Sequence, residues 1–278
     1  MLGSQLTKRA RQLGAALLFS LAVGEPLLAQ VDTVPRIRQF TWRDLAIIEA
    51  FAIMAVAAAP LDRRMALRLQ DSTAQRNRLI RRTATFVRTV ADPGSVLIGV
   101  GMYTYGKLRK NERAADLGLH GTEALAVGEV IGVVLKGVIG RARPYVNIDN
   151  PHDYQLFRGF GSNGAYRSMP SGHTIAAFAA ASAVTSETSR WWPSSVWYIA
   201  PVMYGGAAAA GVSRMYSNAH WASDVATGAA VGTMAGIMVV RWHHSHPGNV
   251  TDRFFLGASL REGFTSGGRA ALQFSPIF

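Results

Sequence analysis

Two residues four positions apart, His220 and Asp224, are the pair in this chain best suited to do chemistry. Ser217 and Asn218 are favourable N-cap residues, so we predict a helix over residues 219–242 with both side chains on one face of its first turns. The aspartate could then accept a hydrogen bond from one imidazole nitrogen and leave the other free to attack an electrophile. The spacing therefore predicts an oriented nucleophile or base, and the alternative for such a pair is an ordinary structural hydrogen bond.

An upstream segment is predicted to form an anion-binding helix N-terminus. Pro170-Ser171-Gly172-His173 opens an uncharged run that extends to Ser186. Proline suits the first position of a helix, and the unpaired amides that follow can bind an anion. Gly172 lets the backbone approach that anion closely, and His173 would lie beside it, where an imidazole can protonate a leaving group.

A third segment, from Lys136 to Pro144, places cations at the end of an apolar helix. Lysine is rare in this chain, with four lysines against twenty-five arginines, and Lys136 follows three apolar residues. A buried ammonium needs a negative partner, whereas Arg143 can bind phosphate oxygens through a bidentate fork. Glu129 lies seven residues before Lys136 and is a candidate partner, although a plain polar face is the simpler interpretation.

Together the three segments resemble the type 2 phosphatidic acid phosphatase family, whose superfamily also contains bacterial class A acid phosphatases and vanadium-dependent haloperoxidases. The family pattern is Lys, six residues and Arg-Pro, then Pro-Ser-Gly-His, then Ser-Arg, five residues, His, three residues and Asp. All three parts occur here in order and without a departure between residues 136 and 224. A three-part match with fixed internal gaps is far more specific than any one of its parts.

The resemblance implies a role for each matched residue. His220 corresponds to the nucleophile that becomes phosphohistidine, Asp224 to its orienting partner, and His173 to the general acid on the leaving oxygen. The implied phosphate cradle consists of Lys136, Arg143, Ser171, Gly172 and Arg214. We expect no cofactor and no metal, because these cations and a helix N-terminus already meet the charge that develops on the equatorial oxygens. Water would then attack the phosphohistidine with His173 as the base.

Two further functions are compatible with these residues. Vanadate mimics phosphate in transfer and would be held by the same pocket in a haloperoxidase, although the small size of the chain argues against this. The other is a non-catalytic envelope protein, which the intact histidines and cradle cations argue against, since each buried charge would be unfavourable without an anion. The leading prediction is a metal-independent, acid-phosphatase-like hydrolase of a phosphate monoester, carried by a lipid or a small molecule, or of a lipid pyrophosphate.

The rest of the chain is predicted to be helical, giving an all-α bundle with a core of about six helices. Segments with apolar residues at helical spacing are 42–61, 67–90, 93–105, 114–139 and 191–213. Gly and Ala dominate residues 205–211 and 228–236, which allows close helix packing. The segment 145–169 is predicted to be a loop that shapes the pocket mouth, with Arg167 as a candidate substrate contact.

The two ends of the chain are predicted to lie outside the catalytic domain. Residues 1–29 have a basic start, an apolar stretch and a cleavage site typical of a signal peptide, so we expect an exported protein, periplasmic or membrane-associated, with its active site on the extracytoplasmic side. A helical phosphatase domain would occupy residues 30–248, with its motif core at 116–242. The tail, 249–278, is expected to form a short hairpin at most. His243, His244 and His246 are interpreted as a solvated tail, with metal binding as the alternative.

Composition restricts the partners. The chain has 278 residues and a net charge of +12. Because it has no cysteine, an exported form would depend on a packed core instead of disulfides. No interleaved basic-aromatic motif supports nucleic-acid binding. The arginines between residues 63 and 88 are interpreted as a solvated face, with attraction to an anionic lipid surface as the alternative.

Mean hydropathy is only +0.13, and residues 191–213 alone reach the length of a spanning helix. We nevertheless expect membrane association, because Arg and Trp flank several apolar segments.

Overall fold

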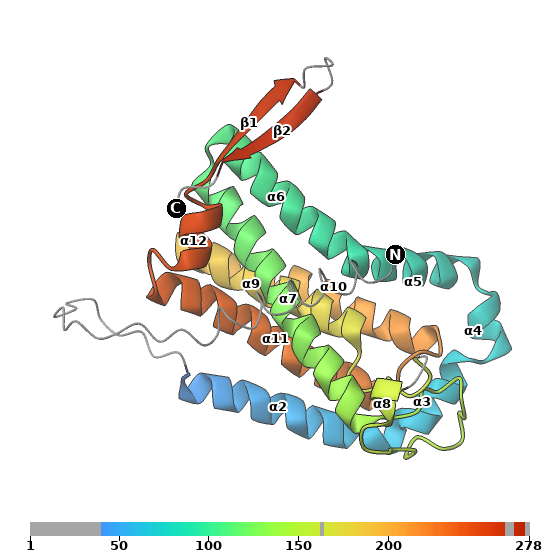
Figure 1. Cartoon of the computed structure of the whole chain (residues 1–278). Coiled ribbons are helices and arrows are strands. Elements are labelled where there is room, and N and C mark those ends of the chain that lie inside the picture. The colour runs from blue at the N-terminus through green and yellow to red at the C-terminus, as the bar shows by residue number, and fades with distance from the viewer. Residues whose placement is uncertain (1–39, 162–163, 265–269, 276–278) are drawn as a thin grey trace, which may run out of the picture. The chain divides into compact units, whose positions relative to one another are not determined.

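The computed structural model describes residues 40–161, 164–264 and 270–275, and the predicted signal peptide lies outside them. Helices make up most of the described chain (Figure 1). In chain order the elements are α2 (Trp42–Ala58), η1 (Ala59–Leu61), α3 (Asp62–Leu69), α4 (Ser72–Arg76), α5 (Arg78–Thr89), η2 (Val90–Gly94), α6 (Ser95–Arg109), α7 (Glu112–Ile139), α8 (Arg158–Gly161), α9 (Gly172–Trp191), η3 (Pro193–Ser195), α10 (Val196–Tyr216), α11 (Ala222–Ser245), α12 (Val250–Phe255), β1 (Ser259–Phe264) and β2 (Ala270–Ser275). The all-α prediction is confirmed. The two strands pair as an antiparallel hairpin.

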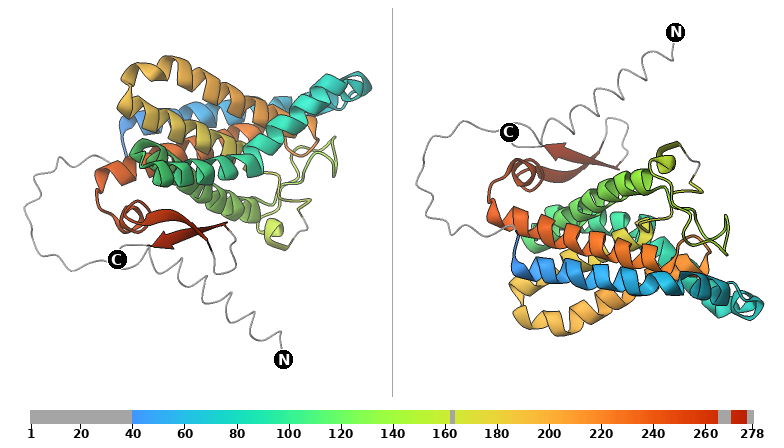
Figure 2. Two further views of the ribbon diagram at one scale, coloured as in Figure 1. Left: turned by 90° about the horizontal axis from the view of Figure 1, so that it is seen from above. Right: turned by 90° about the horizontal axis from the view of Figure 1, so that it is seen from below.

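Helices α7, α9 and α11 pack against one another, and each also contacts a flanking helix. Helix α6 packs along α7, α10 packs along α9, and α2 packs along α11, as Figures 1 and 2 show. The core between α7, α9 and α11 is built mainly of small side chains, among them Ala124, Ala176, Ala179 and Ala183. Small core residues bring the helix axes close together, so that side chains at the ends of these helices can meet.

Helices α9 and α11 approach each other closely along a glycine stripe on α11, which consists of Gly228, Gly232 and Gly236. A Cβ atom added at Gly228 would lie 2.7 Å from the Ser171 carbonyl oxygen, and one at Gly232 would overlap the Ile175 carbonyl oxygen. These positions exclude any side chain, because α9 backbone already occupies the space. The small residues predicted to allow close helix packing therefore bring the N-terminus of α9 against the start of α11.

Several boundaries differ from the sequence predictions. Helix α9 continues to Trp191 instead of ending near Ser186, because Glu187 is fully buried and bonded to histidines of two other helices. The segment 67–90 is divided into α3, α4 and α5, since Asp71 and Asn77 each cap a new helix by accepting hydrogen bonds from backbone amides.

The interpretation of the C-terminal histidines as a solvated tail is wrong for His243 and His244. His243 is only 2% exposed and His244 is partly buried, whereas His246 alone of the three is exposed. The reason is that α11 extends to Ser245 and α12 then folds back, so that Asp252 contacts His243.

Two helical stretches are long and apolar enough to cross a membrane, Trp42–Leu69 and Ala222–Ser245. In the most apolar part of the first only 6% of the residues are buried, against 56% in the second. The stretch selected from sequence, residues 191–213, is not one of them, although most of it lies in the single helix α10.

Candidate active site

The second and third motifs are joined directly at the N-termini of α9 and α11. The Ser171 amide donates a hydrogen bond to the Asp224 carbonyl oxygen, 3.1 Å away. The Ser171 side chain does not cap α9 and instead accepts a hydrogen bond from the Thr174 hydroxyl at 2.8 Å. The first amides of α9 are thus free of side-chain capping by Ser171, which suits a helix N-terminus that binds an anion.

His220 is buried and held in one tautomer. Its Nδ1 lies 2.7 Å from the Ser168 carbonyl oxygen, and only 3% of the residue is exposed. A carbonyl oxygen can only accept a hydrogen bond, so we assign the proton to Nδ1. The lone pair of Nε2 is therefore available for attack on an electrophile.

The predicted hydrogen bond between His220 and Asp224 is not formed. Asp224 Oδ2 lies 3.7 Å from His220 Nδ1, which is beyond hydrogen-bonding distance. The reason is that α11 begins at Ala222, three residues later than predicted, so His220 precedes the helix and its Nδ1 turns to Ser168. The carboxylate still lies within ion-pair distance of the imidazole, and its Oδ2 accepts a hydrogen bond from the Ser168 hydroxyl at 2.5 Å.

Asp224 is fixed by two other donors. Its Oδ2 accepts from the Trp221 amide at 2.8 Å, which caps α11, and its Oδ1 is 2.5 Å from Nη1 of Arg141. Arg141 is 1% exposed and also bonds Asp62 Oδ2 at 2.6 Å. Asp62 in turn accepts from the amide and hydroxyl of Ser223. This buried network connects α3 to the start of α11 and fixes the loop between α10 and α11 that carries His220.

Arg141 and Ser168 were missed by the sequence analysis. Arg141 lies two residues before Arg143 within the first motif, and only Arg143 was assigned a role. The two guanidinium groups bind different partners: Arg141 bonds Asp224 and Asp62, whereas Arg143 Nε donates to the Gly164 carbonyl oxygen at 2.8 Å. The family pattern, Lys, six residues and Arg-Pro, selects Arg143 and gives Arg141 no role, and nothing in the sequence distinguished Ser168 from other loop serines.

Lys136 lies against the N-terminus of α9. A Cβ atom at Gly172 would be 2.6 Å from its Nζ, and the Lys136 side chain is 12% exposed. Glu129 Oε2 is 3.9 Å from the ammonium, so the interpretation of Glu129 as its partner is the better one. The Lys136 ammonium therefore lies beside the first turn of α9, next to Gly172.

Two arginines add to this positive region. Arg143 is held by the predicted loop, through its backbone amide to Ala165 and its Nη2 to the Arg167 carbonyl oxygen at 3.4 Å. Arg214 at the end of α10 is 8% exposed, and its Nε has no hydrogen-bond partner among the described residues. Burial, with Arg88 and Arg143 nearby, lowers the pKa of Arg214 to about 10, so it stays charged at neutral pH. A buried cation with an unsatisfied donor indicates an anion site.

His173 faces the connection between α5 and α6. Its Nδ1 is 3.8 Å from Asp92 Oδ2, and Asp92 lies in the kink at η2 with extended backbone angles. Burial is the main cause that lowers the pKa of His173 to about 3, with the charges of Arg214 and His220 next. Burial likewise lowers the pKa of His220 to about 4, against the opposing effect of Asp224. Both imidazoles are neutral at pH 7, so His220 is competent as a nucleophile before any anion binds.

The comparisons with known proteins agree with this arrangement. Residues 119–247 match the model of the PAP2 superfamily. The resemblance to this superfamily that the three motifs predict is confirmed over these residues. The matched PAP2 region contains all three motifs and every residue of the candidate site described from Lys136 to Asp224.

Curated relatives match over the same part of the chain. A lipid A 1-phosphatase of Porphyromonas gingivalis is 37% identical over 112 residues, which is 40% of this chain and 22% of that protein. A lipid A 1-phosphatase of Rhizobium johnstonii is 37% identical over 109 residues, or 38% of this chain and 39% of that one. The chain therefore matches well under half of the length of these relatives.

A solved structure shares the fold. The transmembrane PAP2 type phosphatidylglycerolphosphate phosphatase of Bacillus subtilis superposes with a TM-score of 0.54 and 20% identity, covering 75% of this chain and all of the other. At this identity the likeness concerns the arrangement of helices alone.

Proposed function

We propose that this protein hydrolyses a phosphate monoester carried by a lipid, through a phosphohistidine formed on His220. The observation that carries the proposal is the buried His220 imidazole, whose Nδ1 is bonded to Ser168 while its Nε2 is left for attack, beside the unsatisfied donor of Arg214. A neutral nucleophile next to an anion-binding region is what phosphoryl transfer to histidine needs. The lipid A 1-phosphatases among the relatives support the same reaction.

The geometry suggests how each group contributes. The non-bridging phosphate oxygens would be bound by Lys136, Arg143, Arg214 and the first amides of α9, which neutralise the charge that develops during transfer. His220 Nε2 forms a bond to phosphorus as the bond to the ester oxygen breaks. His173 gives its proton to that oxygen and later removes one from the water that hydrolyses the N–P bond. Asp224, whose Oδ2 is 3.7 Å from Nδ1 of His220, stabilises the imidazolium by its negative charge.

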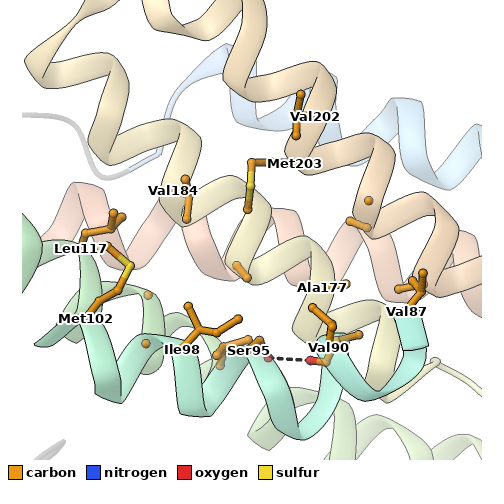
Figure 3. Close-up of a pocket in the computed structure, with 18 of the residues that line it drawn as sticks. Val87, Val90, Ser95, Ile98, Met102, Leu117, Ala177, Val184, Val202 and Met203 are labelled. Carbon is orange, nitrogen blue, oxygen red and sulfur yellow. Dashed lines mark hydrogen bonds between the residues drawn. The ribbon is translucent and has the colours of Figure 1, made fainter. Parts of the chain in front are cut away.

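An apolar cavity supports a lipid as the carrier of this phosphate. It has a volume of about 350 Å³ and lies between α5, α6, α7, α9 and α10 (Figure 3). Its lining includes Ala177, one turn after His173 on α9, and Ala210, one turn before Arg214 on α10. The cavity thus begins close to the phosphate site and continues along the bundle, where it can hold a hydrocarbon chain while the phosphate stays among the cations.

Apolar side chains exposed on several helices support action at a membrane. Among the most exposed are Trp42, Val56, Leu97, Trp197 and Val202. Apolar residues at this density on a surface favour contact with lipid over contact with water. We propose that the catalytic domain, residues 30–248, is exported by its N-terminal segment and acts from the extracytoplasmic side of a membrane, as the sequence predicts.

The test is phosphate release by the purified full chain in detergent with EDTA present. Phosphatidic acid and a water-soluble aryl phosphate are compared, each with the wild type and with His220→Ala. We expect release from the lipid that falls to background in the variant, and an acid-labile phosphoprotein that only the wild type forms. Equal release by His220→Ala would overturn the histidine mechanism. Release from the aryl phosphate but not from the lipid would overturn the lipid assignment.

A further inference from the structure

The opposite end of the bundle from the candidate active site holds a second buried polar cluster. It consists of six residues on four helices: His120 and Glu123 on α7, Glu187 on α9, His243 and His244 on α11, and Asp252 on α12. His120 lies sixteen residues before Lys136, which is about 24 Å along α7. The proposed mechanism uses none of these residues.

The three histidines of this cluster each place one ring nitrogen at hydrogen-bonding distance from a glutamate carboxylate. His120 Nδ1 is 2.5 Å from Glu187 Oε1, and His243 Nε2 is 2.5 Å from Glu123 Oε2. His244 Nε2 is a second donor to Glu187, at 2.9 and 3.0 Å from its two oxygens. When these nitrogens carry the protons, the lone pairs of His120 Nε2 and His243 Nδ1 lie on the other edge of each ring.

Both lone pairs point at the same carboxylate. Asp252 Oδ1 is 3.5 Å from His120 Nε2 and 2.7 Å from His243 Nδ1, and the two imidazole rings are stacked with centroids 4.0 Å apart. His120 is 2% exposed, and its Nε2 has no hydrogen-bond partner among the residues that the structure describes. Three electron-pair donors converge here, all within 4.8 Å of one another.

The charge of the surroundings favours a cation at this point. Glu123, Glu187 and Asp252 contribute three carboxylates, and the half-buried Asp116 lies near enough to interact with His120 and Glu187. Lys107, the nearby cation, is engaged with the Leu256 carbonyl oxygen. Buried carboxylates in excess of cations are costly unless a positive charge is bound among them.

We propose that His120 Nε2, His243 Nδ1 and Asp252 Oδ1 bind one divalent transition-metal ion of the zinc class. Two imidazoles and one carboxylate form a ligand set typical of zinc, whereas Ca²⁺ and Mg²⁺ prefer oxygen ligands alone. Glu187 and Glu123 occupy the positions from which carboxylates orient metal-binding histidines in other proteins, through the second ring nitrogen. The ion connects α7 and α11 to α12 and so secures the C-terminal tail, apart from the phosphate chemistry.

The test uses the full chain in detergent, free of any affinity tag, dialysed against Zn²⁺ and then passed through a desalting column. We expect about one Zn²⁺ per chain by elemental analysis, and a Co²⁺-loaded form with visible absorption bands typical of nitrogen and oxygen ligands. Asp252→Asn, on the partly exposed α12, should weaken Zn²⁺ binding at least about tenfold and remove the rise in melting temperature that Zn²⁺ causes. The matched control is His246→Gln, an exposed histidine next to the cluster, which should bind Zn²⁺ like the wild type.

The competing account is a doubly protonated His243 that bonds both Glu123 and Asp252 without a metal. It predicts no Zn²⁺ retained by the wild type, and that result would overturn the proposal. Equal retention by the wild type and Asp252→Asn would also overturn it, because the bound metal would then lie elsewhere. The wild-type stoichiometry and Co²⁺ spectrum remain decisive if Asp252→Asn does not fold. Phosphate release by Asp252→Asn in EDTA reports whether it has folded.

Discussion

His173 is the single residue whose protonation must change most during the proposed reaction. Burial and the surrounding cations lower its pKa to about 3, whereas a general acid must be protonated when the leaving oxygen departs. A bound dianion reverses the sign of the local potential, so we expect it to raise the pKa of His173. Sulfate binding at pH 6 to 7 should therefore take up as much as one proton, and His173→Ala should remove that uptake. Calorimetry in buffers of different ionisation enthalpy measures it directly.

Sulfate suits this measurement because it does not titrate in this pH range. Wild-type binding without proton uptake would contradict the assignment of His173 as the acid. The same imidazole would then be neutral both with and without anion. If His173→Ala still takes up the proton, His220 is the group whose pKa moves.

The residues that the sequence could identify are those proposed to bind the phosphate, since their types and fixed gaps carry the chemistry. Lys136, His173 and His220 belong to this set. The residues that orient them could not be found in the same way. Arg141 bonds Asp224 directly and is held in turn by Asp62, which lies 79 positions earlier in the chain. Ser168 contacts His220 through its backbone carbonyl, which any residue type has.

Helices were predictable from the spacing of apolar residues, but their ends were decided by tertiary contacts. Ser217 and Asn218 are good N-caps by type, yet α10 continues to Tyr216 and α11 starts only at Ala222. The residue that caps α11 is Asp224, whose carboxylate accepts a hydrogen bond from the Trp221 amide. Arg141 and Ser168 hold this carboxylate in place. A local propensity worth about 1 kcal/mol does not outweigh a buried network of this kind.

The contact between α9 and α11 depends on Gly232, whose added Cβ would overlap the Ile175 carbonyl oxygen and crowd the Ala179 amide. Gly232→Ala should therefore destabilise the fold by about 1–3 kcal/mol, because backbone on both sides must move apart. Gly205→Ala on the exposed face of α10 is the matched control, since nothing lies within 4 Å of its Cβ. Alanine there should stabilise the helix by up to about 1 kcal/mol. Thermal unfolding of the two variants in the same detergent compares them, and an equal change in both would contradict the close packing.

For the described chain as a whole, class and architecture followed from composition and periodicity, but the docking of α2 did not. Asp44 is 1% exposed and bonds Arg241 on α11 with two contacts, at 2.5 and 2.9 Å. Neither residue stood out in the sequence, because an ion pair between positions 197 apart has no local signature. The apolar cavity was equally hidden, since the residues that line it are typical of any helical core.

The cavity should separate lipid substrates from soluble ones. Ile98 lines it from α6 and is 56% exposed, so Ile98→Trp can fill the cavity mouth with little disturbance of the core (Figure 3). We expect kcat/KM for phosphatidic acid to fall about tenfold or more, because the indole competes with the hydrocarbon chain, while hydrolysis of an aryl phosphate is unchanged.

Val130→Trp is the control, since Val130 is a similarly exposed residue of α7 outside the cavity lining. If both variants lower lipid hydrolysis equally, the loss reflects detergent or membrane contact, and the cavity is not where the chain binds. If Ile98→Trp also lowers aryl phosphate hydrolysis, α6 supports the phosphate site through Asp92 and His173.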